Sequence, residues 1–330
     1  MTNLTLSIAT GDYDRVRALV SGAVRIDGTD PIFNLLGPEE IFFRAFRNAE
    51  FDVCELSFSS YCSHVARGDC AYIGVPVFPS RMFRHGAIYI RTDRGIEQPS
   101  DLIGRRVGIP EWQLTALVWV RALLADEYKV LPADLKWVQG GIEEAGRIEK
   151  AKIDLPAGVV IQSAPAGSTL SGMLEAGEID AFISPRAPSC YERRAPNIGQ
   201  LFGDTVGEAT KFYQKTRIFP IMHVLGVRRE LAERHPWLPV ALFKAFNSAK
   251  DIATQQLAVV AACTVTLPFV EERLNEARQL MGADYWSYGL ESNRHVIETF
   301  LRHHHSQGLS HRLLKAEELF HPATLQTHRI

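Results

Sequence analysis

The sequence has none of the short motifs that mark common metal and cofactor sites. No G-x-G-x-x-G, Walker A or H-E-x-x-H pattern occurs, so dinucleotide, nucleotide and zinc-peptidase sites have no support. The cysteines are odd in number and form no C-x-x-C pair, which argues against a disulfide framework or a thiolate metal site. We therefore expect reduced, mostly buried thiols, no metal and no cofactor. The cysteines are Cys54, Cys62, Cys70, Cys190 and Cys263.

Long hydrophobic runs are also missing. The longest apolar stretch lies near residues 257–263, and a membrane-spanning helix needs about 20 such residues. The first ten residues lack the basic and apolar regions of a secretory signal and lead directly into a strand pattern. We therefore expect a cytoplasmic protein with no membrane partner.

Neither sign of charge is in excess. Lys and Arg total 36 against 38 for Asp and Glu, which gives a net charge of -2 and argues against a nucleic-acid partner. A composition of 46% hydrophobic and 22% charged residues is that of a globular protein. A chain of 330 residues suits two lobes with a central cleft, each lobe having its own core.

Strand patterns and helix patterns alternate along the chain, which indicates an α/β fold. Residues 4–8 read as a strand and 14–19 as a helix, and Pro38 starts another helix with acidic residues in its first turn. A helix is expected over 111–124, and residues 230–311 are mostly helical. Such alternation suggests parallel sheets, whose ligands bind beyond the carboxyl ends of the strands.

The lobes are expected to be discontinuous in the sequence. Residues 92–104 form a polar crossover marked by Gly and Pro, and residues 218–227 read as the strand by which the chain returns. We therefore assign residues 1–97 and 218–330 to the first lobe, and residues 98–217 to the second.

Several segments resemble known families. The crossover at residues 91–110 and the segment Leu-Glu-Ala-Gly-Glu-Ile-Asp-Ala-Phe at 174–182 resemble type II periplasmic binding proteins. Four further segments make the chain similar to the 4,5-dihydroxyphthalate decarboxylases over nearly its whole length. They are residues 108–121, which start Gly-Ile-Pro-Glu-Trp-Gln, Phe-Pro-Ile-Met-His at 219–223, Tyr-Gly-Leu-Glu-Ser-Asn-Arg at 288–294 and Gln-Gly-Leu at 307–309.

The resemblance implies a carboxy-lyase of phthalate degradation on a two-lobed fold of the periplasmic-binding-protein type. Its expected reaction converts 4,5-dihydroxyphthalate, a small aromatic dicarboxylate, to protocatechuate and CO2. Two other classes compete: a non-catalytic receptor for an aromatic carboxylate, and a relative of the thiamine-pyrimidine synthases. The missing signal peptide argues against the receptor, and the missing Cys cluster argues against the synthase. Fold alone does not decide function. Whether copies associate into a homo-oligomer is left open.

Decarboxylation of this kind needs an acid for the ring carbon, a base for a phenol and a clamp for the retained carboxylate. His223 is the candidate acid because its intrinsic pKa suits proton transfer, and a hydrogen-bonded core histidine is the plain alternative. Glu111, at an expected helix start, is the candidate base, although helix stabilisation explains it as well. The assignment of acid and base among His223, Glu111 and His85 is left open.

Arginine suits the clamp because its planar fork meets a carboxylate through two hydrogen bonds. The loop after one predicted strand concentrates positive charge in Arg81, Arg84 and His85. Arg186 follows a strand of the second lobe, and a structural ion pair is its alternative. Further candidates for substrate binding are Ser59, Ser60, Asp12, Tyr13, Gln113, Thr115 and Ser184.

Plain structural roles compete for several of these. Helix capping explains Ser59 and Ser60, and a simple turn explains Asp12 and Tyr13. The run from His303 to His305 resembles a metal site only superficially, because consecutive helical residues cannot converge on one ion. We expect that run to be a solvated helix face.

Overall fold

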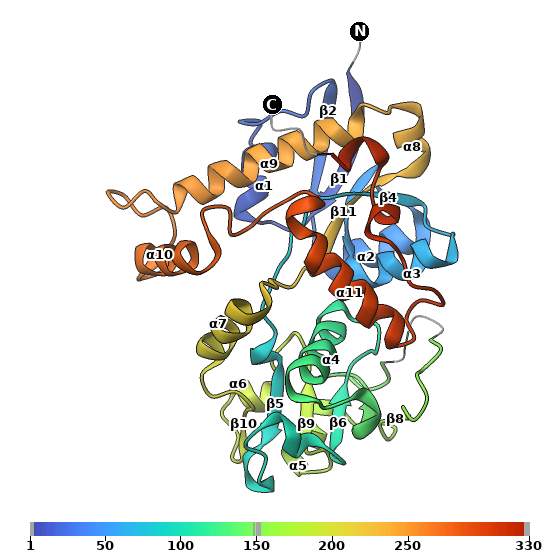
Figure 1. The fold of residues 1–330 in the computed structure, drawn as a ribbon, viewed down its shortest axis with the longest axis vertical. Coiled ribbons are helices and arrows are strands. Elements are labelled where there is room, and N and C mark those ends of the chain that lie inside the picture. The colour runs from blue at the N-terminus through green and yellow to red at the C-terminus, as the bar shows by residue number, and fades with distance from the viewer. Residues whose placement is uncertain (1–2, 148, 150–152, 327–330) are drawn as a thin grey trace. The chain divides into compact units, whose positions relative to one another are not determined.

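A computed structural model describes residues 3–147, 149 and 153–326 of the chain (Figure 1). Its contacts divide the chain into two compact units. Unit 1 comprises Met1–Arg81, Ile221–Ile297 and Lys315–Ile330, and unit 2 comprises Met82–Pro220 and Glu298–Leu314.

Unit 1 is built on a five-stranded sheet. The strand order is β2 (Thr29–Leu35), β1 (Leu4–Thr10), β3 (Val53–Ser57), β11 (His223–Arg228) and β4 (Tyr72–Val75). Strands β1, β2 and β3 are parallel, whereas β11 is antiparallel to both β3 and β4. The expectation of parallel sheets is therefore wrong for β11, because the returning strand enters the sheet in the opposite direction. Every residue of the central strand β3 is buried.

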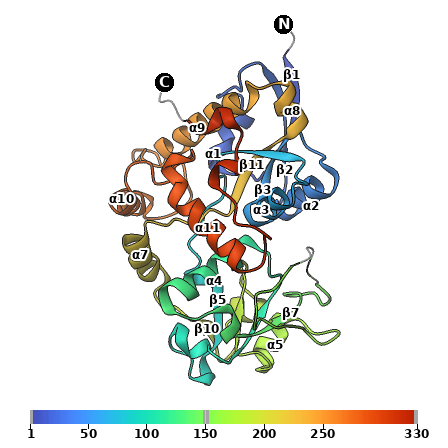
Figure 2. The ribbon, with the colours of Figure 1, turned by 45° about the vertical axis from the view of Figure 1, so that its right-hand side comes forward.

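The same unit contains several helices. They are α1 (Asp14–Val20), α2 (Pro38–Asn48), α3 (Phe58–Arg67), α8 (Arg229–Arg234), α9 (Leu238–Gln256) and α10 (Val270–Met281). Helix α2 begins at Pro38 with acidic residues in its first turn, as the sequence predicts. Figures 1 and 2 both show α9 alongside α1 and α10 beyond the far end of α9.

Unit 2 contains a six-stranded mixed sheet. Its order is β10 (Ile198–Gln200), β5 (Ile88–Arg91), β9 (Ala181–Ile183), β6 (Arg106–Ile109), β7 (Lys136–Gln139) and β8 (Ile161–Ser163). Strand β5 runs antiparallel to β9 and β10, and the strands from β9 to β8 run parallel to one another. The helices of this unit are α4 (Thr115–Tyr128), α5 (Leu170–Ala176), α6 (Ser189–Glu192) and α7 (Thr205–Thr216).

Local sequence explains where the helices of unit 2 begin and end. Helix α5 ends at Gly177, whose φ of 74° is a left-handed conformation that glycine adopts without strain. Helix α4 begins at Thr115, not at the expected residue 111, and each of its residues from Thr115 to Leu124 is buried. An all-round apolar surface of this kind is typical of a helix inside a core.

The units differ from the expected lobes at residues 82–97, 218–220 and 298–314. Strand β5 pairs with β9 and β10, so residues 88–91 belong with unit 2 although they precede the expected boundary at residue 97. Helix α11 (Arg294–Ser306) begins in unit 1, but from Glu298 its residues belong to unit 2. Sheet pairing and helix packing set these boundaries, and neither is visible in the composition of the crossover.

Short 3-10 helices complete the secondary structure. They lie at His85–Ala87, Thr92–Arg94, Pro99–Leu102, Pro132–Asp134, Glu291–Asn293, Ala316–Leu319 and Pro322–Thr324. Within the described ranges, no helix has both the length and the apolar composition that crossing a bilayer requires.

Candidate active site

The carboxyl ends of β1 and β3 and the start of β11 bring a buried carboxylate and a histidine together in unit 1. Glu55 lies in the middle of β3 and is completely buried. His223 is the first residue of β11, and the antiparallel register places it opposite Ser57, two residues beyond Glu55. Because residues two apart on a strand point to the same face, the imidazole and the carboxylate meet, with Nδ1 of His223 2.5 Å from Oε1 of Glu55.

The loop after β1 supplies the other partners of Glu55. The backbone N–H of Gly11 donates to Oε2 at 3.0 Å, and the hydroxyl of Tyr13 donates to Oε1 at 2.8 Å. Thr10 Oγ1 lies 3.5 Å from Oε2. A buried carboxylate is stable only when hydrogen bonds and charge replace its lost hydration, and here both oxygens are satisfied.

Glycine is required at position 11 because the ring of Tyr13 folds back over it. A Cβ atom at Gly11 would lie 2.5 Å from Cζ of Tyr13, which is far inside van der Waals contact. A larger residue would displace the Tyr13 ring and with it the hydrogen bond to Glu55. The position of the tyrosine hydroxyl therefore depends on this glycine.

The ionisation of this cluster follows from its burial and charges. Burial acts to raise the pKa of Glu55, but the charge of His223 and hydrogen bonds from His223, Gly11 and Tyr13 outweigh it, so the pKa is lowered. Burial and the charge of Glu55 raise the pKa of Tyr13, so its hydroxyl stays protonated and donates. Glu55 is thus a carboxylate at neutral pH.

The second ring nitrogen of His223, Nε2, is the one that can take part in proton transfer. A carboxylate that accepts from Nδ1 fixes the ring orientation and the tautomer, which leaves Nε2 to give or take a proton. The His223 side chain is 18% exposed, and the ring of Phe42 packs edge-on against it at 4.8 Å between centroids. The pair has the arrangement of an oriented acid–base histidine.

An arginine lies next to this cluster. The guanidinium of Arg15 lies over the ring of Tyr13 at 4.0 Å and over that of Trp286 at 4.6 Å, and its Nε donates to the carbonyl of Pro79 at 2.5 Å. Its Nη1 is 3.2 Å from Oδ1 of Asp14. The side chain is only 16% exposed, so its charge is held in place. Aromatic faces on a guanidinium stabilise it and fix its plane.

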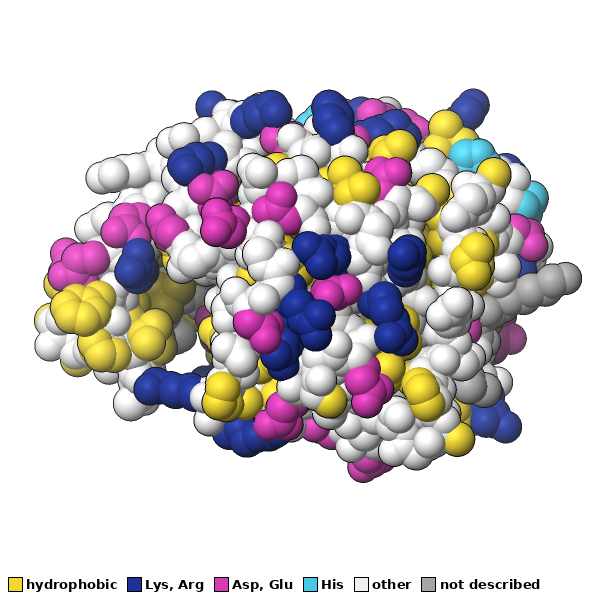
Figure 3. All heavy atoms as spheres, turned by 90° about the horizontal axis from the view of Figure 1, so that it is seen from below, with side chains coloured by type: hydrophobic (Ala, Val, Ile, Leu, Met, Phe, Trp, Pro, Cys, Tyr) yellow, Lys and Arg dark blue, Asp and Glu magenta, His cyan; other side chains and the backbone are white. Residues whose placement is uncertain are grey.

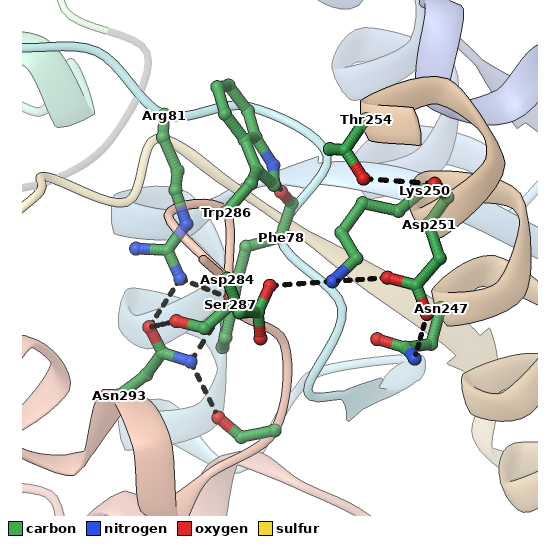
Figure 4. Close-up of polar contacts among 11 residues, drawn as sticks. Phe78, Arg81, Asn247, Lys250, Asp251, Thr254, Asp284, Trp286, Ser287 and Asn293 are labelled. Atoms are coloured by element: carbon green, nitrogen blue, oxygen red, sulfur yellow. Dashed lines mark hydrogen bonds and ion pairs between the residues drawn. The ribbon is translucent and has the colours of Figure 1, made fainter. Parts of the chain in front are cut away.

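Arg81, a predicted clamp residue, is tied to the protein's own chain (Figure 4). Its Nη2 donates to the carbonyl of Ser287 at 2.7 Å and to Oδ1 of Asn293, and its guanidinium lies 5.1 Å from the centre of the Phe78 ring. Arg81 is 4% exposed. These contacts give it a structural role in holding the segment around residues 287–293, and its role toward substrate stays a prediction.

The serines and the first loop lie near the same strand ends. Ser59 and Ser60 fall inside α3, whose N-cap is Ser57, so the expectation that they cap this helix is wrong. Ser59 is completely buried, whereas Ser60 is partly exposed. Asp12 is exposed and lies 3.6 Å from Nε of Arg17, so its carboxylate belongs to a surface ion pair.

In unit 2, Glu111 lies four residues before α4, so the expectation that it stabilises a helix start is wrong. Its Oε1 accepts from Nε of Arg147 at 2.6 Å, and its Oε2 is 3.4 Å from Nε2 of Gln113. Thr115 is the buried first residue of α4. A fixed cation thus partners this buried carboxylate, which is 1% exposed.

A second carboxylate lies nearby. Oε2 of Glu149 accepts from the backbone N–H of Trp112 at 2.5 Å and from Nε2 of Gln139 at 3.0 Å. Burial raises the pKa of Glu149, and the charge of Glu111 adds to this rise. No local signal singles out Glu149, because it lies in a segment without a regular pattern.

Arg84 and His85 belong to unit 2, whereas Arg81 is assigned to unit 1. Burial lowers the pKa of Arg84 to about 10 and that of His85 to about 4, so at neutral pH His85 carries no charge. The His85 ring is 2% exposed and contacts Phe202 and Phe212. The sequence predicted three positive groups in this loop, and this prediction is wrong for His85, which is uncharged.

Arg186 and Ser184 adjoin the end of β9. Ser184 is completely buried, and its hydroxyl accepts from the backbone N–H of Arg186 at 3.1 Å. The Arg186 residue itself is exposed. Their roles toward substrate stay predictions.

The histidine run in α11 differs from the expected solvated face. His303 and His304 are buried, and only His305 is exposed. Nε2 of His303 is 2.7 Å from Asp126, and Nδ1 of His304 is 3.2 Å from the hydroxyl of Ser310. Packing of α11 within its unit, which the local sequence does not reveal, buries them.

Sequence reasoning identified His223 and Tyr13 but missed Glu55 and Arg15. A signal for Glu55 was present: an acidic residue inside an otherwise apolar strand must have a partner when the strand is buried. No comparable signal existed for Arg15, because an arginine in the first turn of a short helix is normally solvated.

Solved structures with the same fold are periplasmic binding proteins and an enzyme. SsuA, the periplasmic sulfonate-binding protein of Methylobacillus flagellatus KT, has a TM-score of 0.58 at 11% identity and covers 98% of this chain and 93% of its own. The aliphatic sulphonate binding protein SsuA of Escherichia coli has a TM-score of 0.55 at 13% identity, covering 98% and 99%. A mutant of the desulfurization enzyme DSZB has a TM-score of 0.53 at 15% identity, covering 98% of both. The chain therefore has the two-lobed α/β fold of periplasmic binding proteins, as predicted.

Sequence relatives identify the family within this fold. A 4,5-dihydroxyphthalate decarboxylase of Comamonas testosteroni is 54% identical over 330 residues, which is 100% of both chains. Another from Pseudomonas putida is 56% identical over 214 residues, or 65% of this chain and 83% of the relative. No family model matches the chain. This protein belongs to the 4,5-dihydroxyphthalate decarboxylase family, a family of carboxy-lyases, and the resemblance seen in its sequence is confirmed.

Proposed function

We propose that this protein converts 4,5-dihydroxyphthalate to protocatechuate and CO2 without oxidation, and that His223 donates the proton. The pairing of His223 with the buried carboxylate of Glu55 carries this proposal. The identity of the substrate is inferred from the names of the two relatives.

The substrate itself provides the electrons for this reaction. Each carboxylate of 4,5-dihydroxyphthalate has a ring hydroxyl para to it. When a base takes the proton of that hydroxyl, charge moves to the ring carbon that bears the carboxylate. This carbon accepts a proton, the carbon–carboxylate bond breaks as CO2 leaves, and the electron pair of that bond restores the aromatic ring. The phenolate then recovers its proton, so the net change replaces CO2 by one proton, and no electron acceptor is needed.

His223 supplies that proton from Nε2 and regains it from solvent. Glu55 acts through the histidine as a positioning residue, because it holds Nδ1 and balances the charge of an imidazolium. Tyr13 and Gly11 hold the Glu55 carboxylate in turn. A positioned proton donor typically contributes about a hundred-fold or more to the rate.

Arg15 binds the retained carboxylate in this proposal. Its guanidinium packs against two aromatic rings, one of which is the ring of Tyr13, whose hydroxyl donates to Glu55. A preorganised arginine loses little freedom when it binds a carboxylate, so it suits this role better than an exposed one. Arg84 and Arg186 remain proposed contributors to carboxylate binding.

Glu111 remains the proposed base for the phenol. Its ion pair with Arg147 supports a carboxylate, but the same ion pair is also what a purely structural glutamate would make. The kinetics and stability of Glu111→Gln separate the two roles.

One experiment tests the proposed reaction. Purified protein is treated with a chelator and incubated with 4,5-dihydroxyphthalate, and protocatechuate and CO2 are measured by chromatography and gas analysis. We expect both products in equal amounts. Binding measured by calorimetry without either product would instead support a receptor, which is the role named for the sulfonate-binding proteins of the same fold. A cytoplasmic location and the absence of nucleic-acid or membrane partners stay predictions.

A further inference from the structure

The segment that follows α9 is unusually apolar for an exposed part of a protein. We call residues 257–281, which include α10, the arm. Residues 258–269 are all exposed, and within α10 only Leu274 is buried. The sequence of residues 258–269 is Ala-Val-Val-Ala-Ala-Cys-Thr-Val-Thr-Leu-Pro-Phe, which contains no charged side chain. Exposed loops normally carry polar and charged residues.

Large hydrophobic side chains of the arm face solvent. Phe269 is 72% exposed, the highest value for any large hydrophobic side chain in the described ranges, and Val260 and Leu267 are 62% and 59% exposed. In Figure 3, hydrophobic side chains gather at the left end of the view, the side on which Figure 1 shows α10. Contiguous exposed apolar surface of this kind marks an interaction site.

The backbone conformation of Phe269 is a second, independent indication of an interaction surface. Phe269 has a φ of 62°, a left-handed conformation that a bulky side chain adopts only under strain. Such strain persists where surrounding contacts favour it, yet within the described chain this ring is the most exposed of its kind. The ring therefore lies at the surface of the described chain, where a second molecule can cover it.

The charges on α10 match those of a second, antiparallel α10. Glu271, Asn275 and Arg278 lie at helical spacing on one face, and their outer members are seven residues and about 10 Å apart. Neither Glu271 nor Arg278 forms an ion pair within the described ranges, whereas Arg273 pairs with Glu276 at 2.7 Å. In an antiparallel pair with its two-fold axis near Asn275, each Glu271 would meet Arg278 of the other copy.

We propose that the arm is a self-association surface, on which a second copy of this chain packs α10 antiparallel to α10 and covers the apolar segment 258–269. A two-fold interface uses the same patch on both copies, which the charge pattern allows. The size also fits, because a stable interface uses about 20–30 residues a side and the arm comprises residues 257–281.

Cys263 provides a natural reporter for this interface. It is exposed in the apolar segment, whereas Cys54, Cys62, Cys70 and Cys190 are buried. A thiol reagent applied to the native protein therefore reports on position 263 first. In the associated protein this thiol is covered.

The test compares the mass and thiol reactivity of the wild type with those of arm variants. Phe269→Asn removes the apolar ring, and asparagine tolerates the left-handed backbone, so the variant keeps its fold. Combined with Leu267→Asp, it should reduce the mass measured by light scattering to about half and make Cys263 react about tenfold faster. Val206→Asp, at a 60% exposed valine outside the arm, is the matched control and should change neither.

Charge reversal tests the antiparallel register separately. Arg278→Glu should weaken association because it places like charges together, and adding Glu271→Arg should restore it. Circular dichroism melts show that each variant is folded. The proposal is overturned if the wild type is a monomer at micromolar concentration with Cys263 freely reactive, or if the double arm variant keeps the wild-type mass.

Discussion

Two buried glutamates, one in each unit, have opposite kinds of partner. Glu55 accepts from a histidine, a tyrosine hydroxyl and a backbone N–H, whereas Glu111 is paired with Arg147. An arginine keeps its proton in a protein, so Arg147 cannot exchange a proton with Glu111. A histidine exchanges protons near neutral pH, so the Glu55 pair can take part in a reaction. Burial alone therefore does not distinguish the two carboxylates, but the chemistry of their partners does.

The largest effect is expected at His223. His223→Ala should lower kcat by about a hundred-fold or more, because it removes the proposed proton donor, and should leave KM and the circular dichroism spectrum nearly unchanged. His311→Ala, at an exposed histidine, should behave like the wild type. Turnover by His223→Ala at the wild-type rate would remove this residue from the mechanism.

Paired substitutions of the two glutamates sharpen the comparison. Glu55→Gln should lower kcat by about 10–100-fold, because Nδ1 of His223 loses its anionic partner. If Glu111 is the base, Glu111→Gln should lower kcat. If Glu111 is only structural, the substitution should lower only the free energy of unfolding, because Arg147 loses its carboxylate partner. Steady-state kinetics and urea unfolding of both variants separate these outcomes. A Glu55→Gln enzyme with normal kcat would contradict the positioning role.

The acid dependence of stability distinguishes Glu55→Gln from the wild type. The pKa of Glu55 is lowered in the folded protein, so its carboxylate contributes stability above the ordinary value of 4.5. This contribution is lost as the pH falls below 4.5 through the lower folded pKa. Glutamine does not titrate, so the free energy of unfolding of Glu55→Gln should vary less with pH in that range.

A smaller effect, mainly on KM, is expected at Arg15. Arg15→Ala should raise KM by about 10–100-fold, because a charge-assisted hydrogen bond contributes about 1.5–3 kcal/mol. Arg17→Ala, on the same helix but 70% exposed, is the control and should leave KM unchanged. Arg186→Ala tests the second predicted clamp in the same assay. If only Arg186→Ala raises KM, the carboxylate is bound there and Arg15 has a structural role.

The last effect concerns stability at low pH and leaves catalysis at neutral pH unchanged. The pKa of His85 falls from 6.5 to about 4 on burial, so the unfolded chain binds the proton first as the pH falls from 6.5 to 4. The folded state should lose up to about 3 kcal/mol over this range. His85→Leu should remove this loss, which urea unfolding at pH 7 and pH 5 measures, and His311→Leu should not. Equal pH dependence in His85→Leu and the wild type would contradict the assignment.

Much of the fold could be predicted because its signals are local. Pro38 with its following acids starts α2, and Gly177 ends α5, since a helix terminus depends on residues within one turn. The missing C-x-x-C pattern predicted free cysteines, and four of the five are buried. The direction of β11 and the boundary before β5 were not predictable, because pairing between strands far apart in the chain leaves no local trace.

The sequence by itself determined the family, the α/β fold and His223 as the residue to examine. Only the tertiary structure decided that Glu55, 168 residues earlier in the chain, is its partner, and that Arg15 lies over the rings of Tyr13 and Trp286. The physical reason is range: helix starts and turns obey forces between near neighbours. The ionisation and aim of a buried side chain depend instead on whichever distant residues the fold brings within hydrogen-bonding distance.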